Sequence, residues 1–117
     1  MKTLPYLAMV EQQALTMFQQ ELRQQFAEVI QAVLLFGSKA RGDSHAESDI
    51  DVLVLITSQD WRLRKAIRGL AAEVNLRYEV DISPRVWPLS EWQELETMSA
   101  AIYQHIQQDG VELELAV

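Results

Sequence analysis

The chain has 117 residues, of which 49% are apolar, and its formal net charge is −7. This size predicts a single domain, residues 1–117, with enough apolar material for a core. The lack of cysteine excludes disulfides and thiolate metal sites, and the acidic balance argues against generic nucleic-acid binding, which depends on neutralising phosphates. Because the sequence has neither a long apolar run nor a signal-peptide pattern, we expect a cytoplasmic protein that does not enter a membrane.

The first predicted element is a helix close to the N-terminus. Apolar side chains recur there every three or four residues, so one stripe faces the core and a glutamine-rich surface faces water. We expect this helix to serve only as scaffold. Its stripe comprises Leu7, Val10, Ala14, Phe18, Leu22 and Phe26.

Two short aliphatic runs, 30–36 and 51–56, are bounded by turn-forming residues and predict buried strands. Gly37 and Ser38 directly follow the first run. A short helix opening at Ser38 would present free amide groups to an anion, and Gly37 would let a ligand approach the backbone closely. The second run is apolar on both faces, which predicts cover on both sides of the sheet.

Two aspartates, Asp49 and Asp51, introduce the second strand. On an extended chain their side chains leave the same face, where they repel each other unless a cation lies between them. Carboxylates combined with substrate phosphates suit Mg²⁺. A phosphate cradle beside magnesium carboxylates indicates nucleotide chemistry. Since one strand ends at this site and the next begins there, we expect the two strands to be antiparallel neighbours.

The loop between these strands holds two further candidates, Arg41 and His45. The guanidinium of Arg41 either reaches a triphosphate oxygen or braces the turn by pairing with a carboxylate. His45 is a weaker candidate for metal binding or acid–base chemistry, because no second histidine or patterned ligand accompanies it in the loop.

A second amphipathic helix is predicted from about Asp60 to Asn75, with Thr57 or Ser58 as its cap. Basic side chains lie largely off its apolar stripe and form either a solvated face or a substrate contact. They are Arg62, Arg64, Lys65 and Arg68.

The segment from Tyr78 to Ser83 alternates apolar and polar residues, which predicts a third strand. Asp81 points away from its apolar face, and Glu79 shares that direction. Prolines 84 and 88 are expected to break the chain after this strand.

The last predicted helix is one continuous element. Ser90 and Gln93 have the spacing of a capping box, and Gly110 is a typical helix stop. The stripe comprises Trp92, Leu95, Met98, Ile102 and Ile106. The acidic residues from 90 onward are either a solvated face or a docking surface for a basic partner, and the tail 111–117 is either an edge strand or a segment that a partner orders.

The motif from Gly37 to Gly42, Gly-Ser-x-Ala-Arg-Gly, is followed by Ser48-Asp-x-Asp51. Together they resemble the signature of the DNA-polymerase-β-like nucleotidyltransferases, and in particular its smallest branch, the minimal nucleotidyltransferases. Members of that branch typically act as antitoxins paired with HEPN-domain ribonuclease toxins. The chain length and element order fit this resemblance, which implies a small α/β domain with a mixed sheet of three to four strands packed by helices.

The resemblance also implies roles for individual residues. Two Mg²⁺ ions would be held by Asp49, Asp51 and a third acid on the next strand, for which Asp81 is the match and Glu79 the fallback. The outer phosphates of ATP would be bound by Gly37, Ser38 and Arg41. The implied reaction transfers AMP from ATP to a hydroxyl, best a tyrosine, of a cognate HEPN toxin.

Two other functions stay open at this point. The chain can be a binding module that neutralises its partner by contact alone, with a vestigial nucleotide site. It can also be a nucleotidyltransferase whose acceptor is a small molecule or an RNA end.

Overall fold

The structure is a computed structural model that describes residues 6–43 and 48–113. In chain order the elements are α1 (Met9–Phe26), β1 (Ile30–Phe36), α2 (Ser38–Arg41), β2 (Ile50–Ile56), α3 (Trp61–Tyr78), β3 (Ile82–Pro88), α4 (Leu89–Thr97), α5 (Ala101–Asp109) and β4 (Val111–Glu112).

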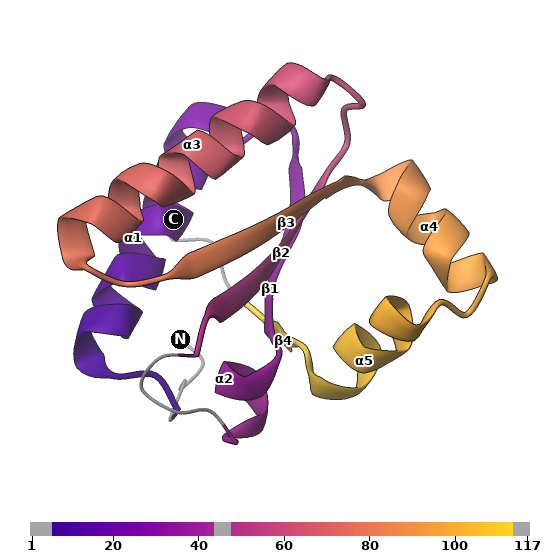
Figure 1. The fold of residues 1–117 in the computed structure, drawn as a ribbon. Coiled ribbons are helices and arrows are strands. Elements are labelled where there is room, and N and C mark those ends of the chain that lie inside the picture. The colour runs from indigo at the N-terminus through magenta and orange to yellow at the C-terminus, as the bar shows by residue number, and fades with distance from the viewer. Residues whose placement is uncertain (1–5, 44–47, 114–117) are drawn as a thin grey trace.

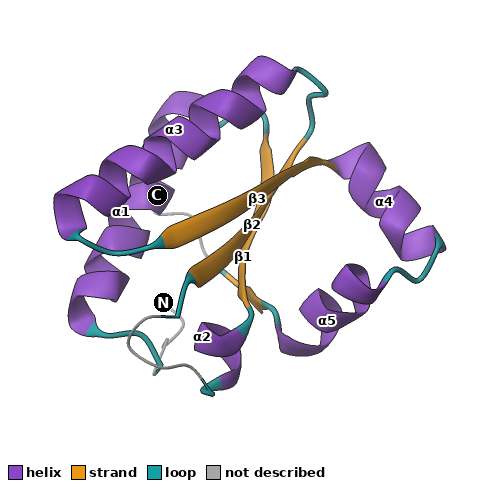
Figure 2. Ribbon diagram, in the orientation of Figure 1, coloured by secondary structure: helices purple, strands orange, loops and turns teal. Residues whose placement is uncertain are grey.

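The strands form one mixed sheet in the order β3-β2-β1-β4 (Figures 1 and 2). Strands β1 and β2 are antiparallel, with Phe36 opposite Asp51, whereas β2 and β3 are parallel. The expected mixed sheet and the antiparallel β1–β2 pair are therefore confirmed. β4 pairs with β1 through Glu112 and Val111, so the start of the tail forms an edge strand.

Helices cover both faces of the sheet, with α1 and α3 on one side and α4 and α5 on the other (Figure 1). In β2, Val52 and Val54 belong to the core cluster beneath α1 and α3, whereas Leu53 and Leu55 pack with residues of α4 and α5. Successive side chains of a strand alternate between faces. Asp51 therefore lies on the face covered by α4 and α5.

Helix α1 differs slightly from the expected stripe. It begins at Met9, Val10 is 43% exposed, and Leu15 is buried instead. In α3 the cap is Asp60, whose side chain accepts a hydrogen bond from the Arg62 amide, and not Thr57 or Ser58.

The predicted third strand, 78–83, is wrong in its bounds. Tyr78 ends α3, Glu79 has a positive φ of 54° at the helix C-cap, and the strand runs from Ile82 to Pro88. The two prolines therefore lie within the strand and do not break it. They are tolerated because β3 is an edge strand, where a missing amide donor leaves no ladder bond unmade.

The single last helix is also wrong, because the chain breaks between α4 and α5. Ser99 has a φ of 50°, and Met98 is 73% exposed and so does not belong to a buried stripe. Ser90 is no cap, since α4 already begins at Leu89 and the Ser90 hydroxyl accepts a hydrogen bond from Gln59. The predicted stop at Gly110 is confirmed as the C-cap of α5.

None of the helices in the described part of the chain combines the length and the apolar character that a membrane span requires.

Candidate active site

The turn after β1 has the form that the sequence predicts. Gly37 has a φ of 76°, and α2 begins at Ser38. The Gly37 carbonyl accepts hydrogen bonds from the amides of Ala40 and Arg41, both at 3.1 Å. The first amides of a helix have no carbonyl partner within it, so the start of α2 presents donors.

Gly37 lies directly against Asp51. A Cβ atom at position 37 would collide with the Asp51 carboxylate oxygen Oδ2, and the positive φ independently disfavours any other residue. The sequence motif therefore has a steric cause, because the Gly37–Ser38 turn and strand β2 meet at this point. This turn is called the phosphate turn below, after the role that the sequence predicts for it.

Helix α2 is fixed from below by Lys39, whose side chain is only 5% exposed. Its Nζ atom lies 3.0 Å from Oε2 of Glu11 in α1. The other Glu11 oxygen, Oε1, accepts a hydrogen bond from the Ala8 amide at 2.8 Å. This largely buried ion pair attaches the phosphate turn to α1. It could not be predicted from the sequence, because its partners are 28 positions apart in the chain.

Asp49, Asp51 and Asp81 lie close together where β2 and β3 begin. The Ile50 amide donates to the Asp81 carbonyl at 2.8 Å, and Ile50 is paired with Ile82 in the parallel register. The chain thus brings the third acid beside the Asp-x-Asp pair. Glu79, the fallback, lies at the C-cap of α3.

Proximity to neighbouring acids shifts the titration of Asp51 and Asp81. A hydrogen bond with Asp49 raises the pKa of Asp81, and burial and the charges of Asp49 and Asp51 add to the effect. Burial raises the pKa of Asp51, and so does the charge of Asp49, whereas Arg85 and Arg41 oppose the shift. Each shift means that the site resists holding its full negative charge.

The donor chemistry of these three acids fits Mg²⁺, which prefers carboxylate oxygens together with substrate phosphates. Within residues 6–43 and 48–113, no group of three or more acidic or histidine side chains is arranged so that it could hold a metal ion.

A cavity of about 390 Å³ opens in front of the phosphate turn. One wall comes from the predicted site and the other from α5. The sequence predicted α5 only as part of one long last helix. The lining residues are Phe36, Gly37, Ser38, Arg41, Asp51, Ile102, His105 and Asp109. Cavities of this size hold small-molecule ligands.

Phe36, which ends β1, lines the cavity although it was not predicted as a site residue. The same holds for three residues of α5, Ile102, His105 and Asp109. Their spacing of three and four places them on one helix face, which is the signal that was available. The loop candidate His45 lies outside the described residues.

Arg41 pairs with carboxylates, as the bracing interpretation predicts, whereas its contact with a phosphate stays a prediction. It lines the cavity, as a phosphate contact requires. It also pairs with carboxylates, with Nε 3.1 Å from Asp43 and Nη1 3.6 Å from Asp109.

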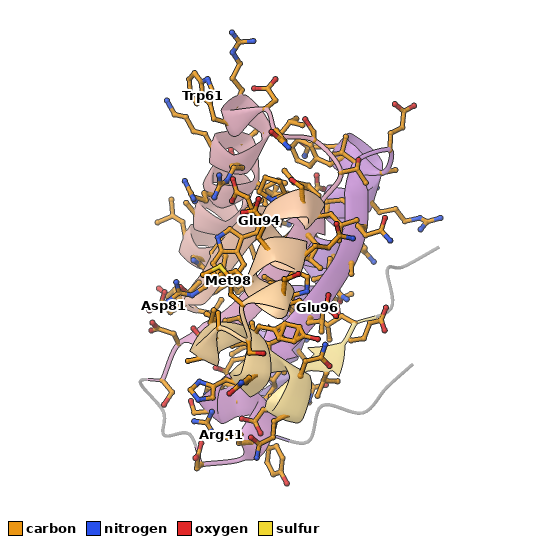
Figure 3. All side chains as sticks on the ribbon, turned by 90° about the vertical axis from the view of Figure 1, so that its right-hand side faces the viewer. Arg41, Trp61, Asp81, Glu94, Glu96 and Met98 are labelled. Carbon is orange, nitrogen blue, oxygen red and sulfur yellow. The ribbon has the colours of Figure 1, made fainter. Side chains whose placement is uncertain are left out.

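The basic residues of α3 do not line the cavity. Trp61, at the start of that helix, lies at the opposite end of the molecule from Arg41 (Figure 3). Arg64 instead donates to the Val86 carbonyl at 3.0 Å, so it braces β3. On α4, Glu94 and Glu96 are exposed (Figure 3), which both a solvated face and a docking surface require.

Comparison with known proteins identifies the family. Residues 18–86 match the family model for polymerase β nucleotidyltransferases, which is more than half of the chain. The chain belongs to this family. Two relatives from Methanocaldococcus jannaschii carry the name "Putative protein adenylyltransferase". MJ0141 is 29% identical over 82% of this chain and 91% of its own length, and MJ1305 is 36% identical over 57% of this chain and 48% of its own.

Solved structures of toxin–antitoxin systems share the fold. A toxin–antitoxin crystallised with AMP-PNP superposes with a TM-score of 0.58 at 23% identity, over 88% of this chain and 73% of that one. A mutant of the toxin–antitoxin MntA-HpeT superposes with a TM-score of 0.54 at 25% identity, over 82% of this chain and 68% of that one. The predicted polymerase-β-like domain is thereby confirmed.

Proposed function

We propose that this chain is an antitoxin nucleotidyltransferase that transfers AMP from ATP to a hydroxyl of a partner toxin. The observation that carries the proposal is the cavity, in which the Gly37–Ser38 turn faces the carboxylate of Asp51, with Asp49 and Asp81 beside it. Relatives named for protein adenylylation and structural neighbours from toxin–antitoxin systems support it.

In this proposal the Gly37–Ser38 turn binds the phosphates of the nucleotide, and the three aspartates bind the cations that neutralise the phosphate charge. The amides at Ser38 and the Arg41 guanidinium hold the outer phosphates. Asp49, Asp51 and Asp81 would hold two Mg²⁺ ions, which when bound neutralise phosphate charge and lower the pKa of the attacking hydroxyl. The reaction then depends mainly on positioning the groups in line.

The bond changes are those of an in-line displacement. The acceptor oxygen bonds to the α-phosphorus of ATP while the bond from that phosphorus to the α–β bridging oxygen breaks. Pyrophosphate leaves with the bonding electron pair, and Asp81 accepts the proton of the hydroxyl. The products are an adenylylated acceptor and pyrophosphate.

We propose a tyrosine of a HEPN toxin as the acceptor. The cavity is lined by the Gly37–Ser38 turn, Asp51 and α5. In this proposal the partner supplies the surface that presents its own hydroxyl. Among protein hydroxyls the phenol is the most acidic, with a pKa of about 10, and so requires the least activation by Asp81.

The test first asks whether a HEPN-domain protein is encoded next to this chain, and then uses that protein as the substrate. A trace of this protein with ATP and Mg²⁺ should add adenylyl groups to an excess of toxin, detected as a mass increase by intact-mass spectrometry. The matched control is Asp49→Asn, which should leave the toxin mass unchanged. Free tyrosine and an unrelated protein should be poor substrates, because neither docks on the domain.

A contact inhibitor would behave differently in the same assay. It would inhibit the toxin only at equal stoichiometry, without ATP, and Asp49→Asn would protect equally well. That result, with an unchanged toxin mass, would refute the enzymatic proposal. Transfer to an RNA end or a small molecule, with no transfer to the toxin, would keep the chemistry and replace the acceptor.

A further inference from the structure

The last residue of α5, Asp109, reaches across the cavity to the phosphate turn. Its Oδ2 atom lies 3.6 Å from Nη1 of Arg41, and its side chain is 20% exposed. Arg41 also has Nε 3.1 Å from Asp43, at a side-chain exposure of 63% for the aspartate. Of these two carboxylates, only Asp109 lines the cavity.

The position of Asp109 is unfavourable for its own helix. The C-terminus of a helix carries a partial negative charge, so an acid in the last turn is repelled, and α5 has no basic residue there to compensate. Among the residues that the structure describes, the pair with Arg41 is the contact of this carboxylate. It also contributes, with Asp43 as the larger cause, to raising the pKa of Arg41.

A guanidinium recognises carboxylate and phosphate oxygens through the same N–H donors. Asp109 therefore occupies the place at Arg41 that a phosphate oxygen would take. Its negative charge would also repel a triphosphate lying between α2 and α5.

We propose that Asp109 is an internal competitor of the nucleotide phosphates for Arg41, and that it lowers the affinity of the site for ATP. The inference rests on the proposed function, because it assumes that the cavity binds a triphosphate. Ion pairs with exposed partners are weak, and here the Arg41 side chain is 43% exposed. Asp109 thus moderates binding, and a nucleotide displaces it by side-chain rotation.

The direct test measures nucleotide affinity by calorimetry with Mg²⁺ and α,β-methylene-ATP, an analogue whose adenylyl group cannot be transferred. Asp109→Asn keeps the size of the side chain and removes its charge. We expect this variant to bind the analogue about three- to tenfold more tightly than the parent protein, with a similar gain for inorganic tripolyphosphate. Adenosine, which has no phosphate, should show no gain.

Two controls locate the effect. Glu94→Gln removes the same charge from the exposed face of α4 (Figure 3) and should leave the affinity unchanged. In an Arg41→Met background, Asp109→Asn should give a clearly smaller gain, because the group for which it competes is gone and only the direct repulsion of the phosphates is relieved. A gain that persists fully in that background would show a general charge effect and would overturn the proposal.

The remaining outcomes are equally decisive. If Asp109→Asn weakens binding, Asp109 orients Arg41 or helps to hold the cation, and the competitor role is wrong. If the parent protein binds the analogue and Asp109→Asn changes nothing, this inference fails while the proposed function stands. If neither protein binds it, both fail.

Discussion

Around the phosphate turn, the basic side chains are paired. Lys39 is buried against Glu11, and Arg41 lies between Asp43 and Asp109. The carboxylate of Asp51 lies against this turn, but its near neighbours include two further acids, Asp49 and Asp81. Asp51 and Asp81 have raised pKa values, since burial and neighbouring negative charges disfavour their ionised forms.

This difference shows which half of the site the protein stabilises without a ligand. The phosphate half is preorganised by the Lys39–Glu11 pair and by the packing of Gly37 against Asp51. The acid half is unfavourable until protons or cations offset its charge. Such strain is typical of sites in which function limits stability.

The largest expected effect comes from substitutions in the acid half of the site. Asp49→Asn or Asp51→Asn should lower AMP transfer by at least about a hundredfold, because each removes a proposed metal ligand while leaving the core packing intact. Asp81→Asn should also be severe, whereas Glu79→Gln should have little effect. The measurement is the initial rate of transfer with Mg²⁺ and ATP.

A matched control is Glu28→Gln, which neutralises an exposed acid between α1 and β1 and should keep full activity. Near-normal rates in Asp49→Asn or Asp51→Asn would refute the role of these carboxylates. An inactive Glu79→Gln with an active Asp81→Asn would move the third acid to position 79.

The second prediction concerns the phosphate half. Gly37→Val forces a β-branched residue into a backbone with positive φ and drives its Cβ into the Asp51 carboxylate. We expect ATP affinity to fall by at least about tenfold. Ser38→Ala should cost less because it keeps the backbone amide.

Calorimetric titration of both variants decides this prediction, with circular dichroism to confirm that each is folded. Unchanged affinity in a folded Gly37→Val protein would remove the turn from the nucleotide site. A larger loss in Ser38→Ala than in Gly37→Val would assign phosphate binding to the hydroxyl instead.

The parts of the fold that the sequence predicted well are those with local causes. Strand β1 is bounded as expected because an aliphatic run stops at Gly37, whose steric requirement follows from the close contact with Asp51. The pair Asp49 and Asp51 was found because strand period alone places two such acids on one face. The assignment of Asp81 came from the family resemblance. The strand predicted around it, 78–83, had the wrong bounds and gives the assignment no support.

The parts that could not be predicted depend on distant contacts. Prolines signal a chain break unless the strand is known to lie at a sheet edge, and only the assembled sheet shows that β3 does. The continuous apolar pattern hid the turn at Ser99, and with it the role of α5 in the cavity. Likewise, nothing local to Lys39 indicates that Glu11 will be its buried partner.

The third prediction concerns the ion pair between Lys39 and Glu11, which attaches the phosphate half of the site to α1. Lys39→Met leaves the carboxylate of Glu11, only 13% exposed, without its cation, and should lower the free energy of unfolding by about 2 kcal/mol. The double variant Lys39→Met with Glu11→Gln should recover part of the loss, because the unpaired charge is removed as well. Urea denaturation of the single and double variants measures both effects.

Lys39→Arg is the conservative control and should be the mildest of the three changes at this pair. If Lys39→Met is as stable as the parent protein, the ion pair does not anchor α2, and the contrast between the two halves of the site loses its main support.

The smallest expected effect is the pH dependence of the acid half in protein free of divalent cations. Because the folded-state pKa values of Asp51 and Asp81 are raised, the native protein holds more protons than the unfolded chain between the ordinary carboxyl range and these raised values. Stability from these two groups therefore falls as pH rises through that window and is constant above it. The Tm of the parent protein relative to Asp51→Asn or Asp81→Asn should decrease by about 1–3 °C from about pH 4 to pH 7.

Added Mg²⁺ should raise the Tm of the parent protein at pH 7 more than that of either variant, since a bound cation stabilises ionised carboxylates. Scanning calorimetry in EDTA and in Mg²⁺ checks both statements. A parent-to-variant difference that is independent of both pH and Mg²⁺ would show that the three carboxylates do not interact, and the contrast with the phosphate turn would disappear.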